Sequence, residues 1–202
     1  MSQLNKRVFL TGFGALAATR VIAQTPPTVR VVLSTSLGAI TLELATAAAP
    51  VTTANFLRYV DAGRYDGADF YRALKMGVAP LAGLIQGGLQ NAPGKLFPSI
   101  AHESTQQTGL SNKDGAIAMA RFEPGTATSE FFICVGDESG LDANPAQPGD
   151  NLGFAVFGHV ADGMNVVHAI LNAPTSPTVG EGVMKGQMLA PTVAITTARR
   201  RA

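Results

Sequence analysis

The sequence predicts a mainly β fold, a β-barrel whose open ends are covered by two α-helices. Many short apolar segments are separated by Gly, Pro, Asn or Asp clusters, and two segments carry apolar residues at helical spacing. Closing a sheet into a barrel is the common way to remove its exposed edges. The chain has 202 residues, of which 46% are hydrophobic and 14% charged, so one globular domain with one substantial core is expected.

The domain opens with a predicted β-hairpin. Val29, Val31 and Leu33 alternate with more exposed positions, and the alternation resumes over 40–44 after a turn at Gly38. Further strands are predicted wherever short apolar runs are bounded by turn residues. These candidate strands span 69–74, 84–86, 116–120, 131–135 and 154–159, with a closing strand over 187–197.

Two amphipathic helices interrupt the strands. In the first, Pro50 stands near the first turn, Phe56 begins an apolar series at helical spacing, and Gly63 ends the helix. The second follows Gly163, and its apolar residues over 164–171 share one face. A barrel with a helix over each end accounts for both.

The first residues resemble a signal peptide, assigned to 1–23 and removed on export. Lys6 and Arg7 form a positive region, 8–18 is mainly apolar, and 21–23 offers small or aliphatic residues for cleavage. The apolar run of about a dozen residues is short of the roughly 20 that span a bilayer, so no stable membrane insertion is expected. Lys6-Arg7 also resembles a twin-arginine signal with Lys in the first place. Either route predicts a periplasmic or otherwise exported protein.

The mature chain then divides into a linker at 24–28, a folded domain at 29–198 and a solvated basic tail at 199–202. The formal net charge of +1 becomes −2 when the signal peptide takes three positive charges with it. A nucleic-acid partner is therefore not expected. Cys134 is the only cysteine, which excludes an intrachain disulfide, and its apolar surroundings predict a buried, inert thiol.

Metal, hydrolase and phosphate-binding sites find little support. Three histidines are far apart and lack the usual zinc-ligand spacings: His102, His159 and His168. Ser129 lies beside Glu130 without a nucleophile elbow or an identifiable base, and Gly87-Gly88 is not followed by the Lys-Ser or Lys-Thr of a phosphate loop. Neither a metal nor a cofactor is expected.

Five short segments carry the most specific signal. They are Phe70-Tyr71-Arg72, Ile85-Gln86-Gly87-Gly88, the run 115–120 (GAIAMA), the run 129–134 (SEFFIC) and the run 154–160 (FAVFGHV). They resemble the motifs of the cyclophilins and occur in the same order. With Asn55-Phe56 in the first helix and Gly163-Met164 at the second, the resemblance covers nearly the whole mature chain.

The resemblance implies a closed eight-stranded antiparallel barrel that isomerises X-Pro bonds of exported proteins, acting as a monomer on proline-containing polypeptides. Its implied catalytic residues are Arg72, Gln86 and Glu130. Its implied substrate-binding residues are Met119, Ala120, Arg121, Phe132, Leu141 and Phe154. In this set the apolar side chains form a proline pocket with Phe154 at its edge, while the backbone of Ala120 and Arg121 bonds the substrate chain.

Such a site needs neither nucleophile nor cofactor. Rotation about an X-Pro bond meets a barrier of about 18–20 kcal/mol and takes tens to hundreds of seconds unaided. In the twisted state the prolyl nitrogen regains its lone pair, and Arg72 would donate a hydrogen bond to it. Strand alternation places Phe131 and Phe132 on opposite faces, and the motif selects Phe132 as the pocket floor.

The chain departs from the cyclophilin pattern at four positions. Glu130 replaces the usual glutamine, and its carboxylate could pair with Arg72, fixing its geometry while neutralising part of its positive potential. Gly83 and Gly140 stand where aromatic residues are common, and Phe154 stands in place of a frequent histidine. The missing aromatic at 140 implies weaker binding of cyclosporin-type inhibitors.

Two other functions remain open at this stage. One is a chaperone or scaffold on the same fold, which would bind proline-containing segments with little turnover. The retained Arg72, Gln86 and Phe132 favour an enzyme, and the departures favour the binding protein. The other is a hydrolase that would use Ser129.

Overall fold

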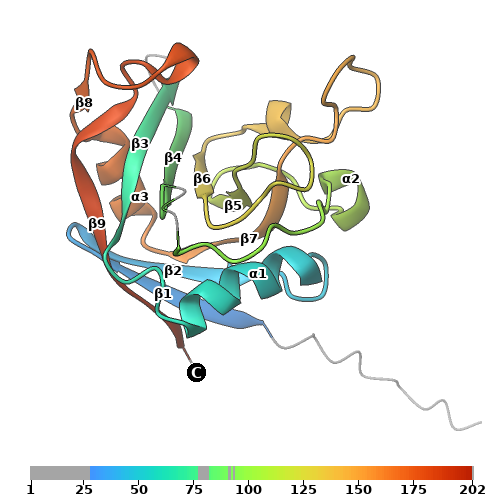
Figure 1. The fold of residues 1–202 in the computed structure, drawn as a ribbon, viewed down its shortest axis with the longest axis horizontal. Helices are drawn as coiled ribbons and strands as arrows, with labels where there is room; N and C mark the ends of the chain where they lie inside the picture. Colours follow the sequence, from blue (N-terminus) through green and yellow to red (C-terminus); the bar gives the residue numbers. More distant parts are fainter. Residues whose placement is uncertain (1–27, 77–81, 91, 93, 202) are drawn as a thin grey trace, which may run out of the picture.

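The computed structural model describes residues 28–76, 82–90, 92 and 94–201, so the predicted signal peptide lies outside the described residues. Within them the chain forms nine strands and three α-helices (Figure 1). The strands are β1 (Val29–Thr35), β2 (Gly38–Leu44), β3 (Ala68–Met76), β4 (Ala82–Gly88), β5 (Ala116–Met119), β6 (Phe131–Val135), β7 (Ala155–Asp162), β8 (Thr175–Ser176) and β9 (Met188–Arg201).

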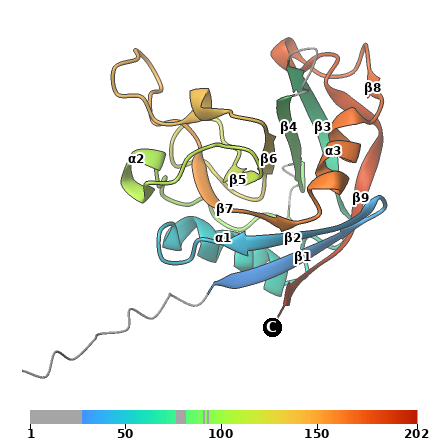
Figure 2. The ribbon, with the colours of Figure 1, turned by 180° about the vertical axis from the view of Figure 1, so that it is seen from behind.

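Eight of these strands close into an antiparallel barrel, as predicted. Their order is β1-β2-β7-β5-β6-β4-β3-β9, and β9 pairs with β1 to complete the ring. The two-residue strand β8 pairs with β9 outside this ring. Figure 2 shows the closing pair from behind, with β9 running along β1. Closure satisfies the backbone groups that an open edge would leave unpaired.

Both predicted helices are present, and the chain forms a third, one-turn helix in addition. They are α1 (Pro50–Asp61), α2 (Thr105–Thr108) and α3 (Met164–Asn172). Figures 1 and 2 show α1 and α3 on different sides of the barrel. Glu103 accepts hydrogen bonds from the backbone N–H groups of Val51 and Thr52 and thereby caps α1 from outside the helix. No helix within the described part of the chain is long and apolar enough to cross a membrane.

The interior of the barrel is packed with aromatic side chains. Phe131 makes edge contacts with Phe56, Tyr65 and Phe70, at ring-centroid distances of 5.5 to 5.7 Å. Its neighbour Phe132 points the other way, into a separate apolar cluster on the outside of the sheet. The predicted alternation is therefore confirmed, and it decides which phenylalanine can reach a ligand.

Residues 199–201 do not form the predicted tail, although their side chains are exposed. Strand β9 continues through Arg201, beyond the expected end at 197, and pairs with β1. Arg200 donates two hydrogen bonds to the Asp61 carboxylate, and Arg199 does the same to Asp66. These arginines belong to the barrel, and their acidic partners come from the end of α1 and from the turn that follows it.

Candidate functional site

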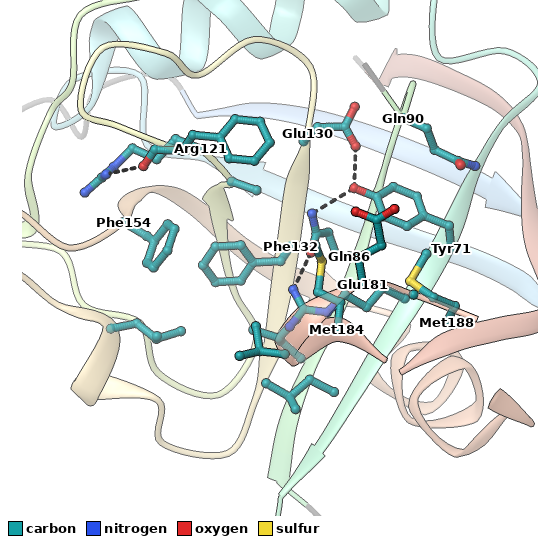
Figure 3. Close-up of a pocket in the computed structure, with 18 of the residues that line it drawn as sticks. Tyr71, Gln86, Gln90, Arg121, Glu130, Phe132, Phe154, Glu181, Met184 and Met188 are labelled. Carbon is teal, nitrogen blue, oxygen red and sulfur yellow. Dashed lines mark hydrogen bonds between the residues drawn. The ribbon is translucent and has the colours of Figure 1, made fainter. Parts of the chain in front are cut away.

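A cavity of about 580 Å³ lies on the outer face of the barrel, between β3, β4, β6 and the loops around them (Figure 3). Eight of the nine predicted site residues line it: Arg72, Gln86, Ala120, Arg121, Glu130, Phe132, Leu141 and Phe154. They come from six separate segments of the sequence. The fold therefore assembles almost the whole predicted set at one place.

One end of the cavity is apolar. Phe132 is only 3% exposed and meets Phe154 edge to face, with 5.4 Å between the ring centroids and an angle of 86°. Leu84, Leu141 and Ala120 also line the cavity and pack in the same outer cluster. A small apolar ring entering here would meet a hydrophobic floor and walls, the kind of surface that removes apolar groups from water.

The other end carries a chain of hydrogen bonds that begins at a cation and ends at a carboxylate (Figure 3). Arg72 Nη1 donates to Gln86 Oε1 at 2.8 Å, and Gln86 Nε2 donates to the Tyr71 hydroxyl at 2.7 Å. That hydroxyl donates to Glu130 Oε2 at 2.6 Å. Glu130 is thus linked to Arg72 indirectly, through Gln86 and Tyr71, and does not form the direct pair that the sequence suggested.

The carboxylate of Glu130 is held by several donors and is only 6% exposed. Its Oε1 accepts from the backbone N–H of Leu89 and from the Ser129 hydroxyl, each at 2.9 Å. Gly88 leaves room for this group: its φ is 146°, and a Cβ on it would lie 2.7 Å from Glu130 Oε2. A buried carboxylate needs such donors to offset the loss of water.

Burial and a neighbouring charge keep the proton on Tyr71, and Arg72 remains a cation despite its burial. Burial, followed by the nearby charge of Glu130, raises the pKa of the Tyr71 hydroxyl far above its ordinary value, so the hydroxyl remains a donor. Burial lowers the pKa of Arg72, although a guanidinium in a protein stays cationic. Neutral amide oxygens from Gln86 and Gln187 accept its hydrogen bonds, at 2.8 Å each. Neither of these bonds cancels the charge of Arg72.

The placement of Met119 in the pocket is wrong. Met119 is 1% exposed and lies in the interior cluster of the barrel, because it sits opposite the inward-pointing Phe131. Strand alternation turns Ala118 outward instead. The thioethers that do line the cavity belong to Met184 and Met188, in a segment for which no site residue was predicted.

Tyr71 was also missed, because simple alternation places neighbours on opposite faces of a strand. Here the register shifts between Phe70 and Arg72, which pair with Gly87 and Gln86, so Tyr71 is an extra residue in β3. Such a bulge re-aims side chains. Both Tyr71 and Arg72 consequently line the cavity.

Arg121 contributes its side chain to the wall of the site. Its guanidinium bonds Asp150 and the Gly153 carbonyl and lies 5.3 Å from the centre of the Phe154 ring. The hydrogen bond from Arg121 holds the pKa of Asp150 below its usual value. The backbone N–H of Ala120 donates to the Glu130 carbonyl, which fixes this strand end. Backbone bonds from Ala120 and Arg121 to a substrate remain a prediction.

The two glycine departures differ in their structural reason. Gly83 has φ of 138°, and a Cβ there would lie 1.9 Å from the carbonyl oxygen of Leu74, so no side chain fits on this backbone. Leu84 supplies the apolar surface at this point. Gly140 lies in the 3-10 helix η1 (Ser139–Leu141) with open space around its Cβ position. A side chain would therefore fit at position 140, next to the cavity-lining Leu141.

Two other candidate chemistries can be compared with the structure. Ser129 is fully buried, and its hydroxyl donates to Glu130, so it is not presented to a substrate as a hydrolase nucleophile would be. Within the described residues, no group of three or more His, Cys, Asp or Glu side chains could hold a metal ion. Burial also raises the pKa of the Cys134 thiol to about 12, in agreement with the buried thiol predicted from the sequence.

Comparisons with known proteins agree with this architecture. The model of the family "Cyclophilin type peptidyl-prolyl cis-trans isomerase/CLD" matches residues 30–199. The "Peptidyl-prolyl cis-trans isomerase cyp18" of Streptomyces antibioticus is 39% identical over 156 residues, 73% of this chain and 86% of that protein. A "Peptidyl-prolyl cis-trans isomerase" of Acinetobacter baylyi is 36% identical over 172 residues, 85% of each chain.

A solved structure is also similar. It is a Cryptosporidium parvum cyclophilin type peptidyl-prolyl cis-trans isomerase, crystallised in the presence of the dipeptide Ala-Pro. The TM-score is 0.67 at 21% sequence identity, covering 86% of this chain and 99% of that one. This likeness concerns the fold.

Proposed function

The chain belongs to the family of cyclophilin-type peptidyl-prolyl cis-trans isomerases, and we propose that its outer cavity isomerises X-Pro bonds with Arg72 as the catalytic residue. The observation that carries the proposal is the presence of the Arg72 guanidinium and the apolar floor formed by Phe132 in one cavity. A twisted prolyl amide needs these two features, a cationic donor and a site for the ring.

The proposed mechanism uses binding alone. Phe132, Leu141 and Phe154 hold the proline ring, while the acyl part of the amide rotates. As the prolyl nitrogen loses resonance with the carbonyl, its lone pair becomes an acceptor, and Arg72 donates to it. Because the planar amide offers no such acceptor, the bond forms only near the transition state and lowers the barrier of about 18–20 kcal/mol.

The test is a proline-isomerisation assay on a model peptide, comparing the mature chain with Arg72→Ala. Loss of a donor aimed at developing charge costs about 10²- to 10³-fold in rate, and this is the expected fall in kcat/KM. Arg30→Ala, which removes an exposed arginine paired with Glu43 on the barrel surface, is the matched control. If Arg72→Ala were as fast as the control, the mechanism would be rejected.

We also propose that the substrates are exported proteins and that the enzyme acts as a monomer in the periplasm or an equivalent space. The proposal of export is supported by the signal-like sequence at 1–23, in which Lys6 and Arg7 precede an apolar run. Expression of the full chain, followed by cell fractionation and mass spectrometry of the N-terminus, tests the proposal. Retention in the cytoplasm with an intact N-terminus would overturn it.

One observation favours a second function, the binding of unfolded chain segments with little turnover. Phe122 and Val183 are 78% and 85% exposed, and both line the cavity. Exposed apolar side chains at a binding site suit the apolar residues of unfolded protein. The test is whether each variant still prevents the aggregation of an unfolded protein. If Arg72→Ala does so and Phe122→Ser does not, this function is supported. Equal suppression by both variants would count against it.

A further inference from the structure

We propose that Gln187 is a positioning residue, which fixes the Arg72 guanidinium in the orientation required for catalysis. It lies just before β9, 115 positions from Arg72 in the sequence. Gln187 itself does not line the cavity, so it acts through the arginine. The inference rests on the proposed role of Arg72, and its test separates the two.

The geometry is that of a clamp on two nitrogens of one planar group. Arg72 Nε donates to Gln187 Oε1 at 2.8 Å, and Arg72 Nη1 donates to Gln86 Oε1 at 2.8 Å. Two in-plane hydrogen bonds on different nitrogens determine both the position and the tilt of the guanidinium. Within the described residues, no acceptor holds the third nitrogen, Nη2, which therefore remains available to a ligand.

Gln187 is itself firmly held beside Arg72. Its Nε2 donates to the Val183 carbonyl at 2.6 Å, its backbone N–H donates to the Met184 carbonyl at 3.0 Å, and its own carbonyl accepts from the backbone N–H of Ala73 at 2.9 Å. The last bond ties it to β3, one residue beyond Arg72. The anchor is therefore built into the sheet.

The chemistry of both partners explains why an amide suits this position. Arg72 can only donate and the Val183 carbonyl can only accept, so one side chain must offer an oxygen to the first and an N–H to the second. A glutamine does both. A glutamate would place its second oxygen against the Val183 carbonyl and would also lower the positive potential of Arg72. A leucine of similar size could bond neither.

Removal of the anchor should lower turnover more than affinity. Because the two hydrogen bonds order the guanidinium before the substrate binds, this ordering does not add to the activation free energy. Small displacements of a catalytic group also reduce rates strongly. Loss of one hydrogen bond, worth about 1 kcal/mol, corresponds to about a fivefold fall in kcat. KM should stay within about twofold, because the apolar pocket is unchanged.

The experiment is a double-mutant cycle of Gln187→Leu and Arg72→Ala in the peptide assay, with Lys185→Ala as a control for the same loop. Lys185 is exposed and lies outside the cavity lining. We expect Gln187→Leu to lower kcat about fivefold in the wild-type background and to have no effect when Arg72 is already alanine. Lys185→Ala should match wild type.

The outcomes distinguish the inference from the proposed function. If Arg72→Ala is slow but Gln187→Leu matches wild type, or if the two losses multiply, the positioning role is wrong and the proposed function stands. If Arg72→Ala is as fast as wild type, the proposed function fails first. Hydrogen exchange of the Arg72 Nε–H, followed by ¹⁵N NMR, gives a readout without activity: unchanged protection in Gln187→Leu would overturn the clamp.

Discussion

Tyr71→Phe tests whether the hydrogen-bond chain from Glu130 to Arg72 matters for catalysis. The substitution removes one hydroxyl that is both donor and acceptor, in a residue only 8% exposed. The bond to the carboxylate contributes about 1.5–3 kcal/mol and the bond from Gln86 about 0.5–1.5 kcal/mol, so unfolding free energy should fall by about 2–4.5 kcal/mol. Gln86 loses one of its two anchors, and we expect kcat/KM to fall about fivefold.

The control for Tyr71→Phe is Tyr59→Phe, which removes a buried hydroxyl away from the cavity. The Tyr59 hydroxyl accepts one bond, from the backbone N–H of Phe97 at 2.8 Å. Both variants should unfold at lower denaturant concentration, but only Tyr71→Phe should isomerise a model peptide more slowly. Equal rates in the two variants, with folding verified, would show that the chain of hydrogen bonds is structural and does not serve Arg72.

Glu130→Gln probes the same chain from its acidic end. The variant keeps the size of the side chain but replaces a charge-assisted bond with a neutral one, a loss of about 1 kcal/mol. Turnover on a proline peptide should therefore change. An unaltered rate would mean that residue 130 and Arg72 are not coupled.

Three further outcomes are expected. Gly83→Ala should lower the melting temperature strongly, because its Cβ would lie 1.9 Å from the Leu74 carbonyl oxygen; an unchanged melting curve would contradict this. Cys134, whose pKa of about 12 leaves about one thiolate in ten thousand near pH 8, should react with a thiol reagent only after unfolding. Arg200→Ala should cost about 0.2–1 kcal/mol at neutral pH. Because Arg200 lowers the pKa of Asp61, this difference should vanish as the pH falls below about 4 in acid titrations of unfolding.

Local patterns predicted the barrel well, because alternation and turn residues report on each strand separately. The same rule corrects one site residue once the register between β5 and β6 is known. Phe132 faces outward and pairs with Ala118, so the adjacent Met119 must face the interior. The error arose from taking a motif position without its strand parity.

Other features depend on contacts that no local pattern reveals. The bulge that turns Tyr71 toward the cavity is a property of the pairing with β4. Arg199 and Arg200 resemble a solvated tail until the barrel brings Asp66 and Asp61, more than 130 positions away, into contact. Gln187 likewise meets Arg72 only after β9 has closed the sheet.

The unusual carboxylate at position 130 acquires a clearer role from this network. Arg72 can only donate and the Glu130 carboxylate can only accept, so Gln86 and Tyr71 between them must both be oriented in one direction. A glutamine at 130 could donate as well as accept and would allow Tyr71 a second arrangement. Glu130 therefore favours a single conformation of the chain that ends on Arg72. If the Glu130 carboxylate contacted Arg72 directly, its negative charge would weaken the positive potential needed for catalysis. In this structure the neutral side chains of Tyr71 and Gln86 separate the carboxylate from the arginine.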